Sequence, residues 1–254
     1  MKLFYILMFY ILGSVLASFY GVVATRLLRG ESIVRPGSHC DKCKHPLKWY
    51  DLISGLSFII LKGRCRYCGG KLEWWTWVLE ISLGTIFALS YYAYGLSYNF
   101  YMIIILSSLV VLIFVTDFKE MIILDSPLII SSILIFILKW YYMGLKSAFV
   151  SIFNGIILFL FMLFIGFLGS KIFKREALGG GDIKLSYVIG ASIGITYGFI
   201  ALVLSTFLAL PYATYALLSK LNREVPFGPF LISATLIVFV FIDKFSYILK
   251  VLYM

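Results

Sequence analysis

The stretch Gly179-Gly180-Gly181-Asp182-Ile183-Lys184-Leu185 stands at the start of an apolar run that continues to Ser219. Asp117 has a similar place, because it directly follows the apolar run Phe100–Thr116. A carboxylate within a membrane span costs roughly 2.5–3.5 kcal/mol on insertion scales, so it is rarely kept without a function. Two carboxyl groups brought together can share one proton, which is the arrangement that aspartic proteases use. The sequence therefore predicts that Asp117 and Asp182 work as a catalytic pair.

The composition is that of an integral membrane protein. Hydrophobic residues make up 62% of the chain and charged residues 13%, and the mean hydropathy is +1.00. Soluble domains carry about 25% charged residues. One helical crossing needs roughly 20 apolar residues. The runs of about this length are Leu3–Ala24, Thr76–Gly95, Phe100–Thr116, Ile122–Tyr142, Ser147–Ser170 and Gly228–Leu252.

The remaining run, Leu185–Ser219, is too long for one upright helix and too short for two full ones. Gly194, Gly198 and Pro211 are the residues that can break it, so we interpret it as a short span followed by a full one. The sequence therefore predicts an all-α polytopic membrane protein with about eight transmembrane helices. Seven is the alternative count.

The first run, Leu3–Ala24, also has some features of a signal peptide, with Leu16-Ala17-Ser18 as a possible cleavage region. Only one basic residue, Lys2, precedes it, and the apolar character continues past the small residues to Ala24. We interpret it as an uncleaved first span.

The charge distribution predicts the orientation. Residues 26–73 hold ten basic and four acidic residues, and such a segment beside two spans stays in the cytoplasm. With eight spans, both termini lie outside and both aspartates lie on the cytoplasmic side. The net charge of +10 is explained by this bias and by contact with anionic lipid headgroups. We therefore expect the lipid bilayer, and no nucleic acid, as a partner.

The four cysteines lie in one segment as two C-x-x-C pairs, a spacing typical of structural zinc. Two disulfides or four unpaired thiols are the alternatives, but a reducing cytoplasm disfavours the first and the doubled spacing the second. His39 and His45 flank the first pair and are not needed as ligands. The sequence predicts a small cytoplasmic zinc-binding segment between the first and second spans. Its ligands are Cys40, Cys43, Cys65 and Cys68.

The cysteine pairs after a first span, followed later by a G-x-G-D motif, resemble the type IV prepilin peptidase family. The resemblance covers nearly the whole chain and is carried by an ordered set of motifs. In the N-terminal part these are Ala17-Ser18-Phe19, Arg26, Gly30-Glu31-Ser32-Ile33, the two cysteine pairs, Leu56-Ser57-Phe58 and Glu80. In the remainder they are Thr116-Asp117, Met121-Ile122-Ile123-Leu124-Asp125, Gly179 through Leu185, and Pro226-Phe227-Gly228-Pro229-Phe230.

Three positions depart from the family pattern. Gly21 stands where the family usually has Asn, Leu124 where it has Pro, and Trp75-Thr76-Trp77 where it has an Arg-Tyr-Pro-like run. The first and third lie in the part that the family associates with N-methylation.

The resemblance implies cleavage of a short basic leader from prepilin-like proteins, on the cytoplasmic side of a bacterial inner membrane. It implies Asp117 and Asp182 as the catalytic residues. Supporting roles fall to Asp125, Lys184 and the glycines Gly179, Gly180 and Gly181. Lys184 sets the local field or contacts a headgroup, and Asp125 is also expected to cap a helix. The structural alternatives are a helix-end Asp117 that pairs with Lys119 and an Asp182 that caps its own helix.

The resemblance also implies methylation of the new N-terminal residue with S-adenosyl-L-methionine as donor. Glu80 is then either part of the donor site or a structural residue that pairs with Arg26 or Arg64. The expected parts of the chain are the first span at 1–25, the zinc segment at 26–75, and the peptidase core at 96–254. Residues 1–95 together form the methyltransferase part.

Three alternatives remain open from the sequence. The chain is a peptidase without methylation, an ion- or proton-coupled transporter, or a zinc-bearing membrane scaffold. A transporter predicts acids near the bilayer midplane and internal repeats. Both key acids instead lie at one interface, and no inverted repeat is evident.

Overall fold

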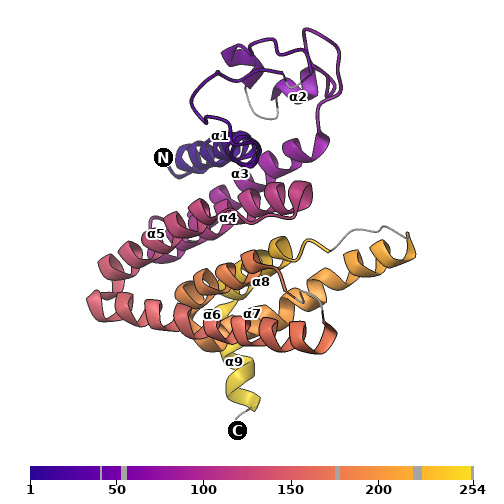
Figure 1. Ribbon diagram of the computed structural model, residues 1–254. Helices are drawn as coiled ribbons and strands as arrows, with labels where there is room; N and C mark the ends of the chain where they lie inside the picture. Colours follow the sequence, from indigo (N-terminus) through magenta and orange to yellow (C-terminus); the bar gives the residue numbers. More distant parts are fainter. Residues whose placement is uncertain (41, 53–55, 175–177, 220–224, 253–254) are drawn as a thin grey trace. The chain divides into compact units, whose positions relative to one another are not determined.

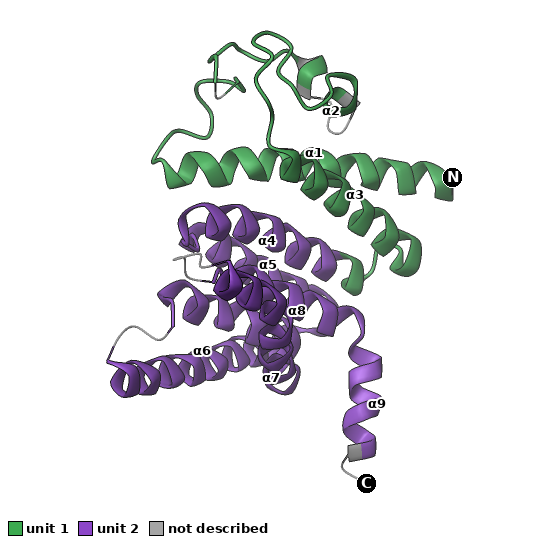
Figure 2. Cartoon of the chain, turned by 90° about the vertical axis from the view of Figure 1, so that its right-hand side faces the viewer, with its two compact units in different colours: residues 1–100 green, residues 101–254 purple. Residues whose placement is uncertain are grey.

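The computed structural model describes residues 1–254 except 41, 53–55, 175–177, 220–224 and 253–254. The described chain is helical, as expected (Figure 1). The elements are α1 (Lys2–Leu28), the 3-10 helix η1 (Trp49–Leu52), α2 (Leu56–Ile60), α3 (Trp74–Tyr94), α4 (Tyr98–Glu120), α5 (Asp125–Met143), α6 (Leu145–Phe173), α7 (Gly180–Leu218), α8 (Gly228–Val240) and α9 (Ile242–Leu252). The chain divides into two compact units, residues 1–100 and 101–254 (Figure 2). Which activity belongs to which part remains a prediction.

The helices make the chain a multi-pass membrane protein. Within the described residues, α1, α4, α5, α6 and α7 are each long and apolar enough to cross a bilayer, and the bent pair α8–α9 gives up to six spans. The expected count of eight is therefore not confirmed. The helix α3 is not among these candidate spans, because Glu80 and several tryptophans and tyrosines lower its mean hydropathy. The helix α7 counts as one of these spans, whereas a short span followed by a full one was expected.

The helix α7 nevertheless has the break that its length predicts. Gly194 has φ 81° and ψ 174°, which is outside the helical region, whereas Pro211 stays inside the helix. Such a residue interrupts the ladder of hydrogen bonds, so the carbonyls of the preceding turn lose their helical partners. Residues 180–193 then form a half-helix about 21 Å long, at 1.5 Å per residue.

Lys139 of α5 supplies a donor at this break. Its side chain is only 9% exposed, and its Nζ donates a hydrogen bond of 2.7 Å to the carbonyl of Ala191. Cations are favourable at a helix C-terminus, where the carbonyls carry partial negative charge. Lys139 therefore stabilises the end of the half-helix that begins near Asp182.

In the first unit, α1 and α3 pack through glycines. A Cβ added at Gly13 would lie 2.8 Å from the carbonyl oxygen of Leu83, and one at Gly84 would lie 2.8 Å from that of Tyr10. The Ser14 hydroxyl donates to the carbonyl of Glu80 at 3.1 Å in the same crossing. Small residues let backbones approach closely in membrane helix pairs. The glycines therefore fix where the two helices cross.

The second unit repeats this device between α6 and α7. A Cβ at Gly190 would lie 3.0 Å from Cα of Gly155, and one at Gly155 would lie 2.8 Å from the carbonyl of Tyr187. The core that α7 and α8 share includes fully buried Leu185, Ile189, Leu231 and Ile232. This packing determines the positions of the first turns of α7 and α8, where the aspartate site lies.

The run Gly228–Leu252, which was expected to form one span, is divided into two helices by a bend. The helix α8 ends at Val240, and α9 follows at an angle of 79°.

Candidate functional site

Asp117 lies in the last turn of α4 and is 6% exposed. Its Oδ2 accepts a hydrogen bond of 3.1 Å from the backbone N–H of Gly228. The helix ends just beyond it, where Met121 adopts a positive φ of 55° and its N–H still bonds to the carbonyl of Asp117. The carboxylate is therefore held from a second element, α8, and not by the Lys119 pairing considered as an alternative.

The segment Pro226–Phe230, in which α8 begins, explains why the Gly228 N–H is available to bond to Asp117. The helix α8 begins at Gly228, and its first internal bonds run from the N–H groups of Phe230 and Leu231 to the carbonyl of Phe227. Gly228 is the first residue of α8, so its N–H has no partner within the helix. Asp117 accepts it and lies at the positive end of the α8 dipole. This contact was not predicted from the sequence.

Asp182 lies in the first turn of α7, whose N-cap is Gly179. Its Oδ1 is buried and has no hydrogen-bond partner among the described residues. The carboxyl group lies close enough to Asp117 for the two charges to repel each other. No side-chain capping bond is present at this helix start, so the capping alternative for Asp182 does not hold. The structure brings the two predicted aspartates together.

Ile123 packs against two glycines, one next to Asp182 and one bonded to Asp117. A Cβ at Gly181 would lie 2.7 Å from Cβ of Ile123, and one at Gly228 would lie 2.7 Å from its Cδ1. The Gly228 Cβ would also lie 3.0 Å from Oδ2 of Asp117. Glycine is therefore required at both positions. Gly180 differs, because a Cβ there would meet nothing within 4 Å.

Asp125 and Lys184 form an ion pair between the start of α5 and the start of α7. The Lys184 Nζ donates to both carboxylate oxygens of Asp125, at 2.7 and 2.9 Å. Asp125 was expected to cap its own helix, but the N-cap is Leu124 and no capping bond forms. The carboxylate instead holds a charged partner. Both side chains are more than half exposed, so the ion pair contributes little to the stability of the fold. Its effect is to connect the start of α5 to the start of α7.

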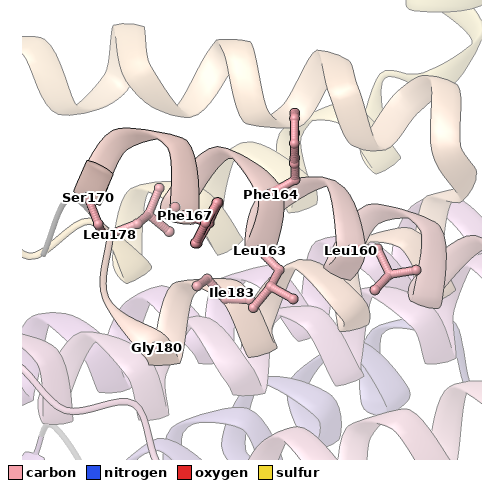
Figure 3. A pocket seen from close by; sticks show the side chains of 9 residues that line it. Leu160, Leu163, Phe164, Phe167, Ser170, Leu178, Gly180 and Ile183 are labelled. Atoms are coloured by element: carbon pink, nitrogen blue, oxygen red, sulfur yellow. The ribbon is translucent and has the colours of Figure 1, made fainter. Parts of the chain in front are cut away.

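An apolar groove lies beside this site (Figure 3). Its volume is about 640 Å³, and it runs between α6 and the first turn of α7. Gly180 and Ile183 form part of its wall and flank Gly181 and Asp182 in sequence. The rest of the wall is Leu160, Leu163, Phe164, Gly166, Phe167, Ser170 and Leu178.

The four cysteines form a second candidate site, in the first unit. Cys40 and Cys65 each begin a turn with the same backbone bonds. The N–H of Cys40 bonds to the carbonyl of His45, and that of Cys65 to Gly70, five residues on in both cases. In return, the N–H groups of Lys44 and Gly69 bond to the two cysteine carbonyls. Both of these residues have positive φ, 58° and 68°. The segment therefore contains two copies of one turn.

The sulfur positions fit a tetrahedral metal site. All four Sγ atoms lie within 4.8 Å of one another, and the Sγ atoms of Cys40 and Cys68 are 4.0 Å apart. Zinc–sulfur bonds of about 2.3 Å in a tetrahedron would place the sulfurs about 3.8 Å apart. All four cysteines are free of disulfides. Neither histidine belongs to the cluster, as expected.

Asp51 joins the second cysteine turn to the segment that follows the first one. Its side chain is 4% exposed and accepts a bond of 2.8 Å from Nε of Arg66, with further bonds from the Tyr67 hydroxyl and the Lys48 N–H. Burial of the carboxylate opposes its ionisation, but these three donors outweigh it and lower the pKa of Asp51. The contact is therefore present at neutral pH and is lost only as the pH falls through this lowered pKa. Sequence reasoning missed it.

Two further residues of the family motifs, Arg26 and Glu80, lie in this unit. The guanidinium of Arg26 donates to the carbonyls of Ser32, Ile33 and Gly37, at 3.0–3.1 Å, and so folds the segment after α1. Glu80 is half-buried in α3. Among the described residues of this unit there is no strand followed by a glycine-rich turn. The surroundings of Glu80 therefore do not identify a nucleotide site.

Comparison with known proteins identifies the family. Residues 11–94 match the bacterial peptidase A24 N-terminal domain, and residues 104–214 match the type IV leader peptidase family. The prepilin leader peptidase/N-methyltransferase of Vibrio cholerae is 31% identical over 258 residues, covering 94% of this chain and 98% of the relative. That of Bacillus subtilis is 28% identical over 244 residues, covering 92% and 94%.

No solved structure matches this chain. The two family models together with the Vibrio relative, which aligns along almost its entire length, decide the classification. The chain belongs to the type IV leader peptidase family.

Proposed function

We propose that this protein cleaves the leader from prepilin-like proteins at the cytoplasmic face of a bacterial inner membrane, and then N-methylates the new N-terminus. The peptidase assignment is supported by the position of Asp117, at the end of α4 and bonded to the first residue of α8, close to Asp182 in the first turn of α7. The names of the relatives from Vibrio and Bacillus support both activities. The excess of basic residues in 26–73 supports a cytoplasmic site.

The surroundings of the two aspartates suggest different roles. Asp117 accepts the Gly228 N–H at a helix N-terminus, and both features stabilise a negative charge. Asp182 also lies in the first turn of a helix, α7, but its buried Oδ1 has no described hydrogen-bond partner, so a charge there would be compensated less well than one on Asp117. The shared proton of the pair therefore resides on Asp182. Asp117 is the general base and Asp182 the general acid.

The reaction follows from these roles. Asp117 removes a proton from water as the water oxygen bonds to the scissile carbonyl carbon, and Asp182 gives its proton to the carbonyl oxygen. In the second step Asp182 takes that proton back, Asp117 passes its proton to the leaving nitrogen, and the C–N bond breaks. The pair returns to its starting state with one shared proton.

The glycines and the groove support a place for the substrate. Gly180 leaves open space beside Asp182, so an extended backbone can approach there. The apolar groove begins at Gly180 and Ile183, and we assign it to the apolar segment that follows the cleavage site. The Lys184–Asp125 ion pair fixes the start of α7 relative to α5. Gly181 leaves room for Ile123 next to Asp182, and Gly179 leaves room for the Asp182 carboxyl group itself.

Replacing either catalytic aspartate by asparagine should abolish cleavage while leaving membrane insertion intact. Asp117→Asn removes the base and Asp182→Asn the acid, and each group contributes roughly 10²–10⁴-fold to the rate. The measurement is the rate of leader removal by each purified variant on a prepilin. Glu120→Gln is the matched control, because it removes an exposed carboxylate three residues after Asp117. Near-normal cleavage by Asp117→Asn or Asp182→Asn would exclude the proposed chemistry.

We also propose that the four cysteines hold one structural zinc ion. The sulfur distances fit a tetrahedral shell, and the same backbone turn presents each pair of thiols. Zinc would supply folding free energy to residues 26–75 and no step of the cleavage. The peptide bond would be cut by the aspartates alone.

The protein should contain about one zinc ion per chain. Replacing Cys40 and Cys43 together by Ser should lose it and destabilise the cytoplasmic segment, because two thiolates cannot hold the ion in a closed site. Metal analysis of purified protein and limited proteolysis measure the two effects. His39→Ala is the control and should keep the metal. Full zinc content in the double-cysteine variant would contradict the assignment.

The proposal of a methylation step is supported by the relatives from Vibrio and Bacillus, which are named as N-methyltransferases. This step would transfer a methyl group from S-adenosyl-L-methionine to the newly freed amine. We assign it to residues 1–95, and Glu80 to a place near the donor, although no described feature around Glu80 forms a donor pocket. Gly21 and the run Trp75-Thr76-Trp77 depart from the family pattern in this part. A peptidase without methylation is the alternative.

A prepilin processed in cells that carry this enzyme alone should gain one methyl group at its new N-terminus. Intact mass and peptide mass spectrometry of the processed pilin test this. A Glu80→Gln variant that cleaves normally but leaves the amine unmodified would support a role of Glu80 in this step. An unmodified N-terminus with the unaltered enzyme would establish the peptidase-only alternative.

A further inference from the structure

The C-terminal helix α9 separates its polar and apolar side chains. Residues at helical spacing of three and four form an apolar side, and the others form a polar side. The apolar side consists of Ile242, Phe245, Ile248 and Leu249. The polar side consists of Asp243, Lys244, Ser246, Tyr247 and Lys250, with Val251 at its edge. A helix that crosses a bilayer has no need of such a polar side.

The helix before it is too short to finish a crossing. The helix α8 has 13 residues, which is about 20 Å at 1.5 Å per residue. The hydrocarbon core of a bilayer is about 30 Å thick. The helix α8 begins at Gly228, against Asp117 near the end of α4, and even an upright helix of this length is about 10 Å too short to reach the opposite boundary from there.

The chain turns at this depth. The angle between α8 and α9 is 79°, and Figure 1 shows α9 leaving the end of α8 at a steep angle. The turn is built into the backbone, because the carbonyl of Phe241 accepts the N–H groups of Lys244 and Phe245 and so starts a new helix. The Lys244 ammonium lies 5.4 Å above the ring of Phe241.

We propose that α9 lies in the membrane–water boundary at the end of α8 that is remote from Asp117, with its apolar side on the lipid acyl chains. Interfacial helices of this kind bury their apolar side by about 5–10 Å, which matches the depth at which α8 ends. The half-buried Ile242, Phe245 and Leu249 and the 51% exposed Ile248 then face the acyl chains. Lys244 and Lys250 reach the phosphates of the headgroups.

Two aromatic residues provide a matched test. Phe245 lies on the apolar side, and Tyr247, which is 70% exposed, lies on the polar side. Each is replaced in turn by a fluorescent aromatic amino acid in the full chain, in nanodiscs of phosphatidylethanolamine and phosphatidylglycerol. Quenching is measured with lipids brominated near the carbonyl end or near the chain terminus, and with aqueous iodide. Retained cleavage of a prepilin shows that each labelled chain is folded.

The probe at 245 should be quenched several-fold more by bromines near the carbonyl end than by bromines near the chain terminus, and hardly by iodide. The probe at 247 should be quenched mainly by iodide. Strongest quenching of both probes by the chain-terminal bromines would mean that α9 crosses the bilayer. Iodide access at both positions would place α9 in water, and shielding of 245 from every quencher would indicate a second copy of the chain. Each of these three results overturns the proposal.

Discussion

The hydrogen bond from the Gly228 N–H to Oδ2 of Asp117 is the contact on which the aspartate site depends. It joins the end of α4 to the start of α8, and it gives a buried carboxylate both a donor and the positive end of a helix. Ile123 packs against the same glycine and against Gly181, which brings the first turn of α7 into the group. Three helix ends therefore meet at one place. The two carboxyl groups differ there in what surrounds them, and that difference is what allows one to act as base and the other as acid.

The interior of the second unit keeps these helix ends in position. The break at Gly194 makes the first part of α7 a half-helix, and Lys139 holds its far end through the carbonyl of Ala191. The close crossing at Gly155 and Gly190 fixes the same half-helix against α6. Asp182 is thus carried on a short element that is held along its length. In the first unit, Asp51 holds the second cysteine turn against the segment that follows the first, through its bonds to Arg66 and Tyr67.

Much of this was predictable from the sequence, because the signals are local. Apolar runs of about 20 residues specify helices, a C-x-x-C pair specifies a turn, and Gly194 inside an overlong run specifies a break. The rest depends on contacts between distant residues. Gly228 and Asp117 are 111 positions apart, and Asp125 was taken for a cap because its partner Lys184 is 59 positions away. The count of eight spans is not confirmed, and the bend after Val240 could not be predicted because it lies within a run whose hydropathy is continuous.

The central claim is that the two aspartates activate water directly and form no covalent intermediate with the substrate. Single-turnover cleavage of a prepilin in water enriched in oxygen-18 tests it, with mass spectrometry of the released leader and of the enzyme peptides that contain Asp117 and Asp182. Direct attack predicts one heavy oxygen in the new carboxylate of the leader and none in either aspartate. A leader without the label, together with a labelled aspartate, would mean that the enzyme carboxylate itself attacked the peptide bond, and would contradict the account.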